Sequence, residues 1–324
     1  MYDIIRELKV WAHDAANCGV LIHGDLLYVC TANGVDGEVC PSPHSPSLIV
    51  LDNRTGQLVG ADEEEIGTRV FHGQWSSPSL AQVGDKTLIL FGAGDGVCYA
   101  FEAFAEVPSV KKSLKKVWPF QCNPPAYLVR DGKAINYWDG DANRDNKYDG
   151  TYVGPSEIIA TPVCYKNRVY VATGQDPAHG RGKGILNCID ATRTGDISRT
   201  GRIWSYDKLD RSVSTVSIAD QLLYVADLPG VIHCLDAETG KCYWTYDTKA
   251  EIWGSTLLAD GKLYVGTRKG FYVLAAGKQP KLLKRVQVGS PVWASPVAAN
   301  DTLFIASQRY LWAVQDLSNH TQQP

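Results

Sequence analysis

The chain has 324 residues, of which 44% are hydrophobic and 10% aromatic, and this composition is typical of a folded globular protein. Its 32 Lys and Arg residues are balanced by 35 Asp and Glu residues, so no charge excess directs the chain to nucleic acid or to an acidic membrane. No segment approaches the roughly 18 apolar residues of a membrane-spanning helix. We therefore expect a soluble protein with no nucleic-acid partner and no membrane span.

The N-terminal segment does not have the pattern of a signal peptide in the sequence as it stands. Asp3 and Glu7 lie in a stretch that has no long apolar run. Residues 7–20 instead predict the last strand of one repeat, with Trp11 in it, followed by the first strand of the next.

A short pattern then recurs six times along the chain: apolar runs of four to seven residues, separated by turns rich in Gly, Asp and Asn. The runs contain many β-branched and aromatic residues, which predicts β-strands. The second strand of each repeat is expected at residues 26–30, 87–92, 168–174, 222–227, 262–267 and 302–307. The third strand is expected at residues 47–52, 97–102, 186–190, 232–236, 271–275 and 310–314.

Four strands per repeat, recurring about every 40 residues, are typical of the blades of a β-propeller. We predict an all-β fold: a β-propeller of four-stranded antiparallel blades, six of them recognisable, with residues 1–324 as one domain. Fourth strands are expected to place indole rings between neighbouring blades, at Trp11, Trp118, Trp204 and Trp244. The last repeat lacks a fourth strand, so two arrangements remain open: the two ends of the chain share one blade, or further blades precede the sequence.

The turns between third and fourth strands share a polar pattern. Asp52, Asp190 and Asp236 each end a third strand and precede a Thr-Gly pair. An Asp carboxylate at this position accepts hydrogen bonds from the turn, and glycine adopts the positive φ that such a turn requires. We therefore expect short, tight turns on this face of the propeller.

The longer connections gather on the opposite face. Residues 31–46 and 173–185 join second to third strands, and an insertion at about 122–157 joins a fourth strand to the next first strand. In antiparallel blades these two kinds of connection lie on the same face. Because binding residues on rigid scaffolds are concentrated in loops, we predict that this face, the decorated rim, carries the function.

Several side chains in these connections have binding chemistry. Tryptophans recur where first strands begin, and packing between blades is the alternative explanation for them. Residues 174–182 form a glycine-rich loop whose polar side chains suit a carboxylate or phosphate, and a flexible rim loop is the alternative there. The predicted ligand- or partner-binding rim consists of His72, Trp75, Trp138, Asp176, His179, Arg181, Trp253 and Trp293.

Two sets of metal ligands can be considered. The insertion has the spacing of a calcium-binding loop, at Asp141, Asn143, Asp145 and Asp149. Tyr152 stands where such loops carry a bidentate Glu, so a solvated acidic loop is the alternative. A second set, without paired spacing, is expected near the central opening, at His13, Asp14, Asn17 and His72.

Residues 236–244, DAETGKCYW, with DNRTGQ at 52–57 and LYVGT at 263–267, resemble the pyrroloquinoline-quinone-like (PQQ-like) propeller repeat family. The resemblance covers nearly the whole chain and is greatest to exported planctomycete-type propellers of this kind. It implies a periplasmic or exported location and, because members commonly have eight blades, an N-terminally truncated sequence. Members also include quinoprotein alcohol dehydrogenases and the outer-membrane assembly lipoprotein, so the family denotes a fold and does not establish a bound quinone.

The sequence lacks the signatures of the catalytic members. It has no adjacent cysteine pair to contact a quinone, no Cys-x-x-Cys-His motif for a haem, and neither the GxSxG nor the HExxH motif of hydrolases. We predict a non-catalytic binding scaffold whose rim loops bind a protein, peptide or carbohydrate. Deletion of residues 136–152 is expected to leave folding largely intact and to abolish partner binding. The alternative is a PQQ- and calcium-dependent quinoprotein oxidoreductase that resembles the alcohol dehydrogenases.

Nine cysteines are spread along the chain without a CxxC motif, so their spacing indicates neither a zinc site nor a redox dithiol. Most are expected to be small buried hydrophobic residues. Cys30 and Cys40 flank one loop, and a disulfide between them is the alternative in an oxidising compartment.

Overall fold

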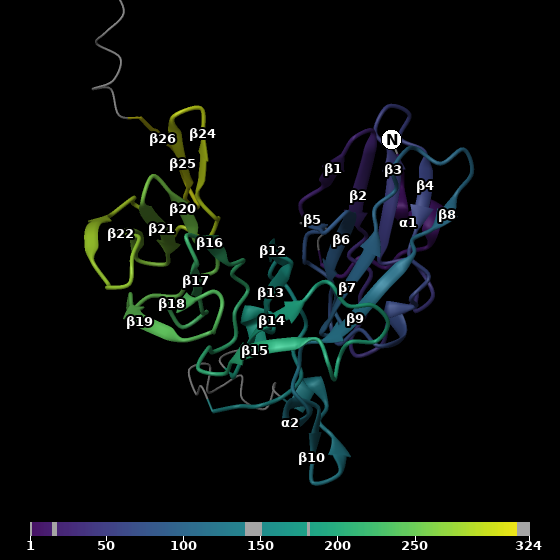
Figure 1. Cartoon of the computed structure of the whole chain (residues 1–324), viewed down its shortest axis with the longest axis horizontal. Helices are drawn as coiled ribbons and strands as arrows, with labels where there is room; N and C mark the ends of the chain where they lie inside the picture. The colour runs from purple at the N-terminus through teal and green to yellow at the C-terminus, as the bar shows by residue number, and fades with distance from the viewer. Residues whose placement is uncertain (1, 15–17, 140–150, 180–181, 316–324) are drawn as a thin grey trace, which may run out of the picture. The chain divides into compact units, whose positions relative to one another are not determined.

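The computed structural model describes residues 2–14, 18–139, 151–179 and 182–315, and Figure 1 shows its strands and helices. Contacts within the chain divide it into two compact units, Met1–Val213 (unit 1) and Ser214–Pro324 (unit 2). Most of the regular structure in the described residues is β-strand. The helical elements are short: α1 (Ile4–Leu8), α2 (Pro125–Leu128) and the 3₁₀ turns η1 (Ile66–Thr68) and η3 (Pro177–His179).

Unit 1 contains three antiparallel sheets, blades 1 to 3, each built from one repeat. Blade 1 consists of β1 (Leu21–His23), β2 (Leu26–Cys30), β3 (Leu48–Asp52) and β4 (Leu58–Ala61). Blade 2 consists of β5 (Ser79–Val83), β6 (Lys86–Gly92), β7 (Val97–Glu102) and β9 (Lys116–Gln121). Blade 3 consists of β12 (Val163–Tyr165), β13 (Arg168–Ala172), β14 (Leu186–Asp190) and β15 (Arg202–Tyr206). A short strand, β8 (Lys112–Ser113), pairs in parallel with β4 and covers the outer edge of blade 1.

Unit 2 contains blades 4 to 6. Blade 4 consists of β16 (Ser217–Ala219), β17 (Leu222–Ala226), β18 (Val231–Asp236) and β19 (Cys242–Asp247). Blade 5 consists of β20 (Leu257–Ala259), β21 (Lys262–Thr267), β22 (Gly270–Ala275) and β23 (Leu282–Val286). Blade 6 has three strands within the described part of the chain, β24 (Val297–Ala299), β25 (Thr302–Ala306) and β26 (Leu311–Val314).

The predicted second and third strands of all six repeats are confirmed, with ends that differ by at most two residues. The signal was strong because the middle strands of a blade are covered on both faces and are therefore largely apolar. The burial of β18 shows this: its four inner residues, 232–235, are all buried.

Two of the four predicted tryptophans, Trp118 and Trp244, pack between blades as the sequence predicted. Trp118 of β9 is fully buried, and its indole Nε1 donates a hydrogen bond of 3.3 Å to the carbonyl of Ala191 in blade 3. Trp244 of β19 is 6% exposed and donates at 2.9 Å to the carbonyl of Gly277, which follows blade 5's third strand. Each indole therefore fastens its own blade to the next one.

The polar turns also have the predicted chemistry. The Asp236 carboxylate accepts the backbone N–H groups of Glu238 and Thr239 at 3.0 and 2.9 Å, and Gly240 has a φ of +74°. The turns after β3 and β14 use their aspartates in the same way.

The predicted strand around Trp11 is wrong. Residues Ile4–Leu8 form α1, and the Asp3 carboxylate caps it by accepting two backbone N–H groups of its first turn. Trp11 is 44% exposed and does not pack between blades. Among the described residues, the segment pairs with the loop after β2 through an isolated bridge between Ala12 and Asn33, and the Trp11 N–H also donates to the Asn33 side chain at 3.1 Å. A capped helix of one turn has no periodicity that distinguishes it from a short strand, which explains the error.

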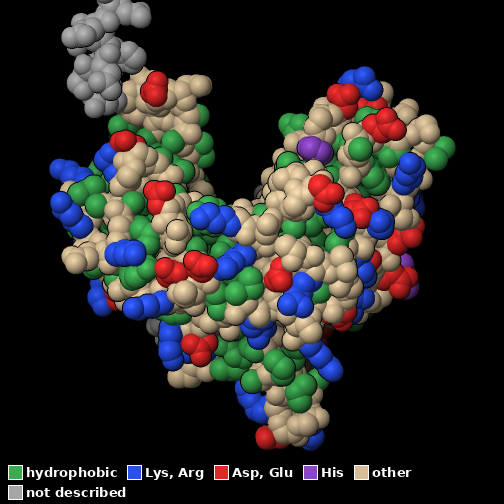
Figure 2. Space-filling model, viewed as in Figure 1, with side chains coloured by type: hydrophobic (Ala, Val, Ile, Leu, Met, Phe, Trp, Pro, Cys, Tyr) green, Lys and Arg blue, Asp and Glu red, His purple; other side chains and the backbone are tan. Residues whose placement is uncertain are grey.

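The insertion at 122–157 has structure of its own. Helix α2 leads into a two-stranded hairpin of β10 (Val129–Arg130) and β11 (Lys133–Ala134), followed by a 3₁₀ turn at 137–139 (Figure 1). On the molecular face seen in Figure 2, acidic and basic side chains are interspersed. None of the helices in the described ranges is long and apolar enough to cross a bilayer.

Candidate functional site

Six rings of unit 1 pack against one another, and we name them the aromatic–imidazole cluster. The ring of His72 is central: its centroid lies 4.2 Å from that of His13 and 4.8 Å from that of His179. The indoles of Trp75 and Trp138 meet it edge-on at 5.3 and 5.1 Å, which is a preferred geometry for aromatic pairs. The members of the cluster are His13, His72, Trp75, Tyr137, Trp138 and His179.

The members come from four separate connections. His13 precedes β1, residues 72–75 join β4 to β5, residues 137–138 belong to the insertion, and His179 lies between β13 and β14. The last two of these are among the long connections that the sequence assigns to the decorated rim, and His72 and Trp75 of the β4–β5 connection are predicted rim residues as well. The structure thus brings together four of the predicted rim residues, namely His72, Trp75, Trp138 and His179, and adds His13 and Tyr137.

Backbone contacts hold His13 against the central imidazole. His13 Nδ1 lies 2.6 Å from the carbonyl oxygen of Val35, so this nitrogen donates its proton there. The Val35 N–H in turn donates at 2.9 Å to the carbonyl of His72. The backbone of Gly34 passes so close to His13 and His72 that a Cβ added at Gly34 would lie 2.7 Å from both the His13 Cβ and the His72 carbonyl oxygen. The position therefore requires glycine.

The cluster has an inner and an outer layer. His72, Tyr137 and His179 are 8%, 3% and 2% exposed, whereas Trp75 and Trp138 are half-buried and present part of their rings to solvent. An inner layer fixed by packing gives the outer indoles a defined orientation, which is what a binding surface requires.

A buried carboxyl group, Glu157, adjoins the inner layer. Its Oε1 accepts the hydroxyl of Tyr137 at 3.1 Å and the backbone N–H of Asp176 at 3.0 Å. Its Oε2 has no hydrogen-bond partner among the described atoms. Burial, with a smaller contribution from the charge of Asp176, raises the pKa of Glu157 to about 8. The carboxyl group is therefore mostly protonated at neutral pH.

Arg211 connects the glycine-rich loop to the same region. It is 1% exposed, its Nη1 donates at 3.0 Å to the carbonyl of His179, and its guanidinium lies 5.1 Å from the ring centroid of Tyr152. Sequence reasoning missed both Glu157 and Arg211. The available signal was Glu157 itself, a charged residue directly before the apolar residues 158–160.

The other predicted site residues lie elsewhere. Asp176 is half-buried, and its carboxylate accepts the N–H of Ala178 at 2.7 Å beside the cluster. Trp253 and Trp293 belong to unit 2, where their rings form a pair with centroids 5.0 Å apart. Six predicted residues lie outside the described ranges, namely Asn17, Arg181 and the calcium ligands Asp141, Asn143, Asp145 and Asp149.

Residues 182–280 match the family described as outer membrane protein assembly factor BamB. The chain carries PQQ-like β-propeller repeats. A search of curated protein sequences found no match. BamB from Moraxella catarrhalis has a TM-score of 0.59 and 16% identity, over 94% of this chain and 70% of its own. The computationally designed protein Ika8 has a TM-score of 0.55 and 13% identity, over 93% and 72%.

The quinohaemoprotein alcohol dehydrogenase from Comamonas testosteroni has a TM-score of 0.55 and 14% identity, over 85% of this chain and 43% of its own length. At these identities the similarity shows the propeller fold and not an activity. Within the described ranges, no group of three or more His, Cys, Asp or Glu is placed to hold a metal ion, and the cluster offers imidazoles rather than the oxygen ligands that calcium prefers.

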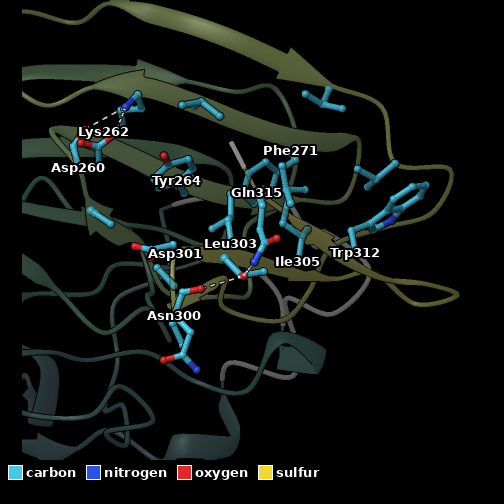
Figure 3. Close-up of a pocket in the computed structure, with 18 of the residues that line it drawn as sticks. Asp260, Lys262, Tyr264, Phe271, Asn300, Asp301, Leu303, Ile305, Trp312 and Gln315 are labelled. Carbon is cyan, nitrogen blue, oxygen red and sulfur yellow. Dashed lines mark hydrogen bonds and ion pairs between the residues drawn. The ribbon is translucent and has the colours of Figure 1, made fainter. Parts of the chain in front are cut away.

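The PQQ-like repeats of unit 2 contain a second feature, a cavity of about 1060 Å³ between blades 5 and 6 (Figure 3). The ion pair of Lys262 with Asp260 lies at one end and Trp312 at the other. Much of the wall is apolar, formed by Tyr264, Phe271, Val273, Val286, Leu303 and Ile305.

The cavity lies where a packing tryptophan is absent. In blade 4, Tyr224 of β17 lies opposite Cys234 of β18, which in turn lies opposite Trp244 of β19. In blade 5, Tyr264 of β21 lies opposite Val273 of β22, which lies opposite Lys284 of β23. Lys284 is exposed. Val286, two residues later on the same face of β23, lines the cavity. Lys284 thus occupies the position from which an indole fills the equivalent space after blade 4.

Proposed function

We propose that this protein is a propeller scaffold that binds a protein, peptide or carbohydrate partner on the loop face of unit 1, at the aromatic–imidazole cluster. One observation carries the proposal: rings from four connections converge into one cluster whose inner members are buried and whose outer indoles are half-exposed. Converging loops on a rigid sheet scaffold are a common way to build a binding site.

The outer layer has the chemistry of a recognition surface. The half-exposed rings of Trp75 and Trp138 offer flat apolar area for a sugar ring or a peptide side chain. The imidazole of His13, which is 17% exposed, adds hydrogen-bonding capacity at the same surface. Large aromatic side chains supported by buried neighbours are frequent hot spots of binding.

The family match supports a protein partner and an envelope location. The matched family is described as an outer membrane protein assembly factor, and its Moraxella catarrhalis member has the same fold. We infer that this chain works outside the cytoplasm, in the periplasm or after export, as a scaffold without an active site of its own.

The test compares Trp138 and Trp253, two tryptophans that the sequence alone assigns to the same predicted binding rim. A peptide array and a glycan array are probed with the purified chain, and the strongest ligand is titrated against Trp138→Ala and Trp253→Ala. Trp253 is 42% exposed and lies in unit 2, so it is a matched surface control. We expect Trp138→Ala to weaken binding at least tenfold, or about 1.4 kcal/mol, and Trp253→Ala to leave it unchanged. Equal affinities of the two variants would contradict the proposal.

The single substitution Trp138→Ala is a more specific test than deletion of the rim loop. Deletion of residues 136–152 would also remove Tyr137, whose hydroxyl donates to the buried Glu157. Because the buried Glu157 carboxyl group would lose one of its two hydrogen-bond donors, the deletion is expected to destabilise unit 1 as well as to remove the rim surface.

The quinoprotein alternative is tested directly. PQQ and Ca²⁺ are added to the purified chain, and bound absorbance and dye reduction with a simple alcohol are measured. Dye reduction that depends on both additions would replace the scaffold proposal with an oxidoreductase.

A further inference from the structure

Two cysteines of blade 1 bind the same backbone oxygen. Cys18, just before β1, and Cys30, the last residue of β2, donate their thiols to the carbonyl of Gln74 at 3.6 and 3.4 Å. Cys30 is 2% exposed and Cys18 is half-buried. In this structure both are thiols.

Because both sulfur atoms lie within 3.6 Å of the same carbonyl oxygen, the two thiols are neighbours. Their side-chain interaction lowers the pKa of Cys18 and, together with burial, raises the pKa of Cys30.

We propose that Cys18 and Cys30 are an oxidation site, a dithiol that a small disulfide such as oxidised glutathione converts to an intramolecular disulfide. The Cys18 thiolate attacks one glutathione sulfur, which forms a mixed disulfide and releases one reduced glutathione. The Cys30 sulfur, after losing its proton, then attacks the Cys18 sulfur and releases the second reduced glutathione. Two cysteine thiols are oxidised and one glutathione disulfide is reduced to two thiols.

The order of attack follows from accessibility and acidity. Cys18 is the more exposed of the two and has the lowered pKa, so it provides the attacking thiolate. Cys30 is buried against it and is placed as the resolving thiol. This pairing differs from the one that loop position suggests, because Cys40 contacts the side-chain amide of Asn33 at 3.7 Å.

Oxidation would change the support of the cluster. A disulfide has no S–H group, so the Gln74 carbonyl would lose both sulfur donors. Gln74 lies between His72 and Trp75 in sequence, and its side-chain amide donates to the carbonyl of Asn33 at 2.7 Å and the hydroxyl of Ser47 at 2.8 Å. The redox state of the two thiols therefore changes the hydrogen bonding of the backbone segment that carries the cluster rings of His72 and Trp75. The disulfide itself does not depend on the proposed binding function.

The experiment is peptide mapping of the reduced, full-length chain after incubation with oxidised glutathione. We expect one disulfide-linked peptide that joins Cys18 to Cys30, and an upward shift of Tm that reduction reverses. A disulfide that contains Cys40, or a glutathione adduct on Cys18 that persists in the unaltered chain, would overturn the proposal, and so would the absence of reaction.

Three variants separate the steps. Cys30→Ser should stop at a stable glutathione adduct on Cys18, because the resolving thiol is gone. Cys18→Ser should leave Cys30 unmodified, and the control Cys40→Ser should form the disulfide as the unaltered chain does. Should either blade 1 variant fail to fold, the mapped linkage in the unaltered chain still decides the question.

Discussion

The aromatic–imidazole cluster of unit 1 and the cavity between blades 5 and 6 of unit 2 are built from the same repeat, but side chains fill the first and leave the second open. In the cluster, long connections bring six rings and a buried carboxyl group into one place. At the cavity, connections are short and a packing indole is replaced by Lys284, so about 1060 Å³ is left unfilled.

Equivalent side chains show the consequence inside unit 2. Tyr272 and Leu274 of blade 5 belong to the same buried cluster as Trp244 of blade 4 and are 3% and 0% exposed. Their counterparts in blade 6, Trp312 and Val314, are 43% and 49% exposed. The repeat thus specifies the strands, while single residues at fixed positions decide whether two neighbouring blades close on each other.

The largest expected effect tests the closed interface. Trp244→Ala should lower the free energy of unfolding of unit 2 by about 3–5 kcal/mol, because it removes a buried indole and its hydrogen bond to Gly277. Urea unfolding followed by circular dichroism measures this change. The matched change at the open interface, Lys284→Ala, should have an effect within about 0.5 kcal/mol. Similar losses in the two variants would show that the interfaces do not differ.

The second prediction concerns the buried acid of the cluster. Because the pKa of Glu157 is about 8 in the folded chain and about 4.3 in an unfolded one, the folded state holds one extra proton between these values. The free energy of unfolding should therefore fall by about 1.4 kcal/mol per pH unit as the pH rises from about 5 to 8.

Glu157→Gln is the matched variant, since its amide keeps an acceptor for Tyr137 and carries no titrating proton. Urea midpoints across this pH range should show the one-proton dependence in the unaltered chain and lose it in the variant. An unchanged dependence in the variant would assign the proton to another group.

The smallest expected effect comes from filling the cavity. Lys284→Trp places an indole where blade 4 has Trp244, and it should raise the free energy of unfolding by about 1 kcal/mol. Binding of the apolar dye ANS to the cavity should fall in parallel. A stabilised variant that binds the dye as before would mean that the indole does not enter the cavity.

The strands were predictable because their signal is local and is repeated six times. The turn chemistry of Asp236 and the packing roles of Trp118 and Trp244 followed from position within a repeat. The prediction of strand rather than helix was wrong near Trp11, where one capped helical turn resembles a strand in sequence. Position within a repeat also grouped Trp75 with Trp253, although the loops around them differ completely.

Sequence alone determined the blades, their turns and the face on which the long loops emerge, because each depends on residues within one repeat. Only the tertiary structure decided that His72 meets His179 and Trp138 and that Glu157 is buried beside Tyr137. It likewise placed the thiols of Cys18 and Cys30 on one carbonyl oxygen, whereas Cys40 contacts Asn33. These contacts join residues from separate connections, and no periodicity relates them. Their distances are set by how blades pack and where loops of unequal length end, which is a property of the folded chain.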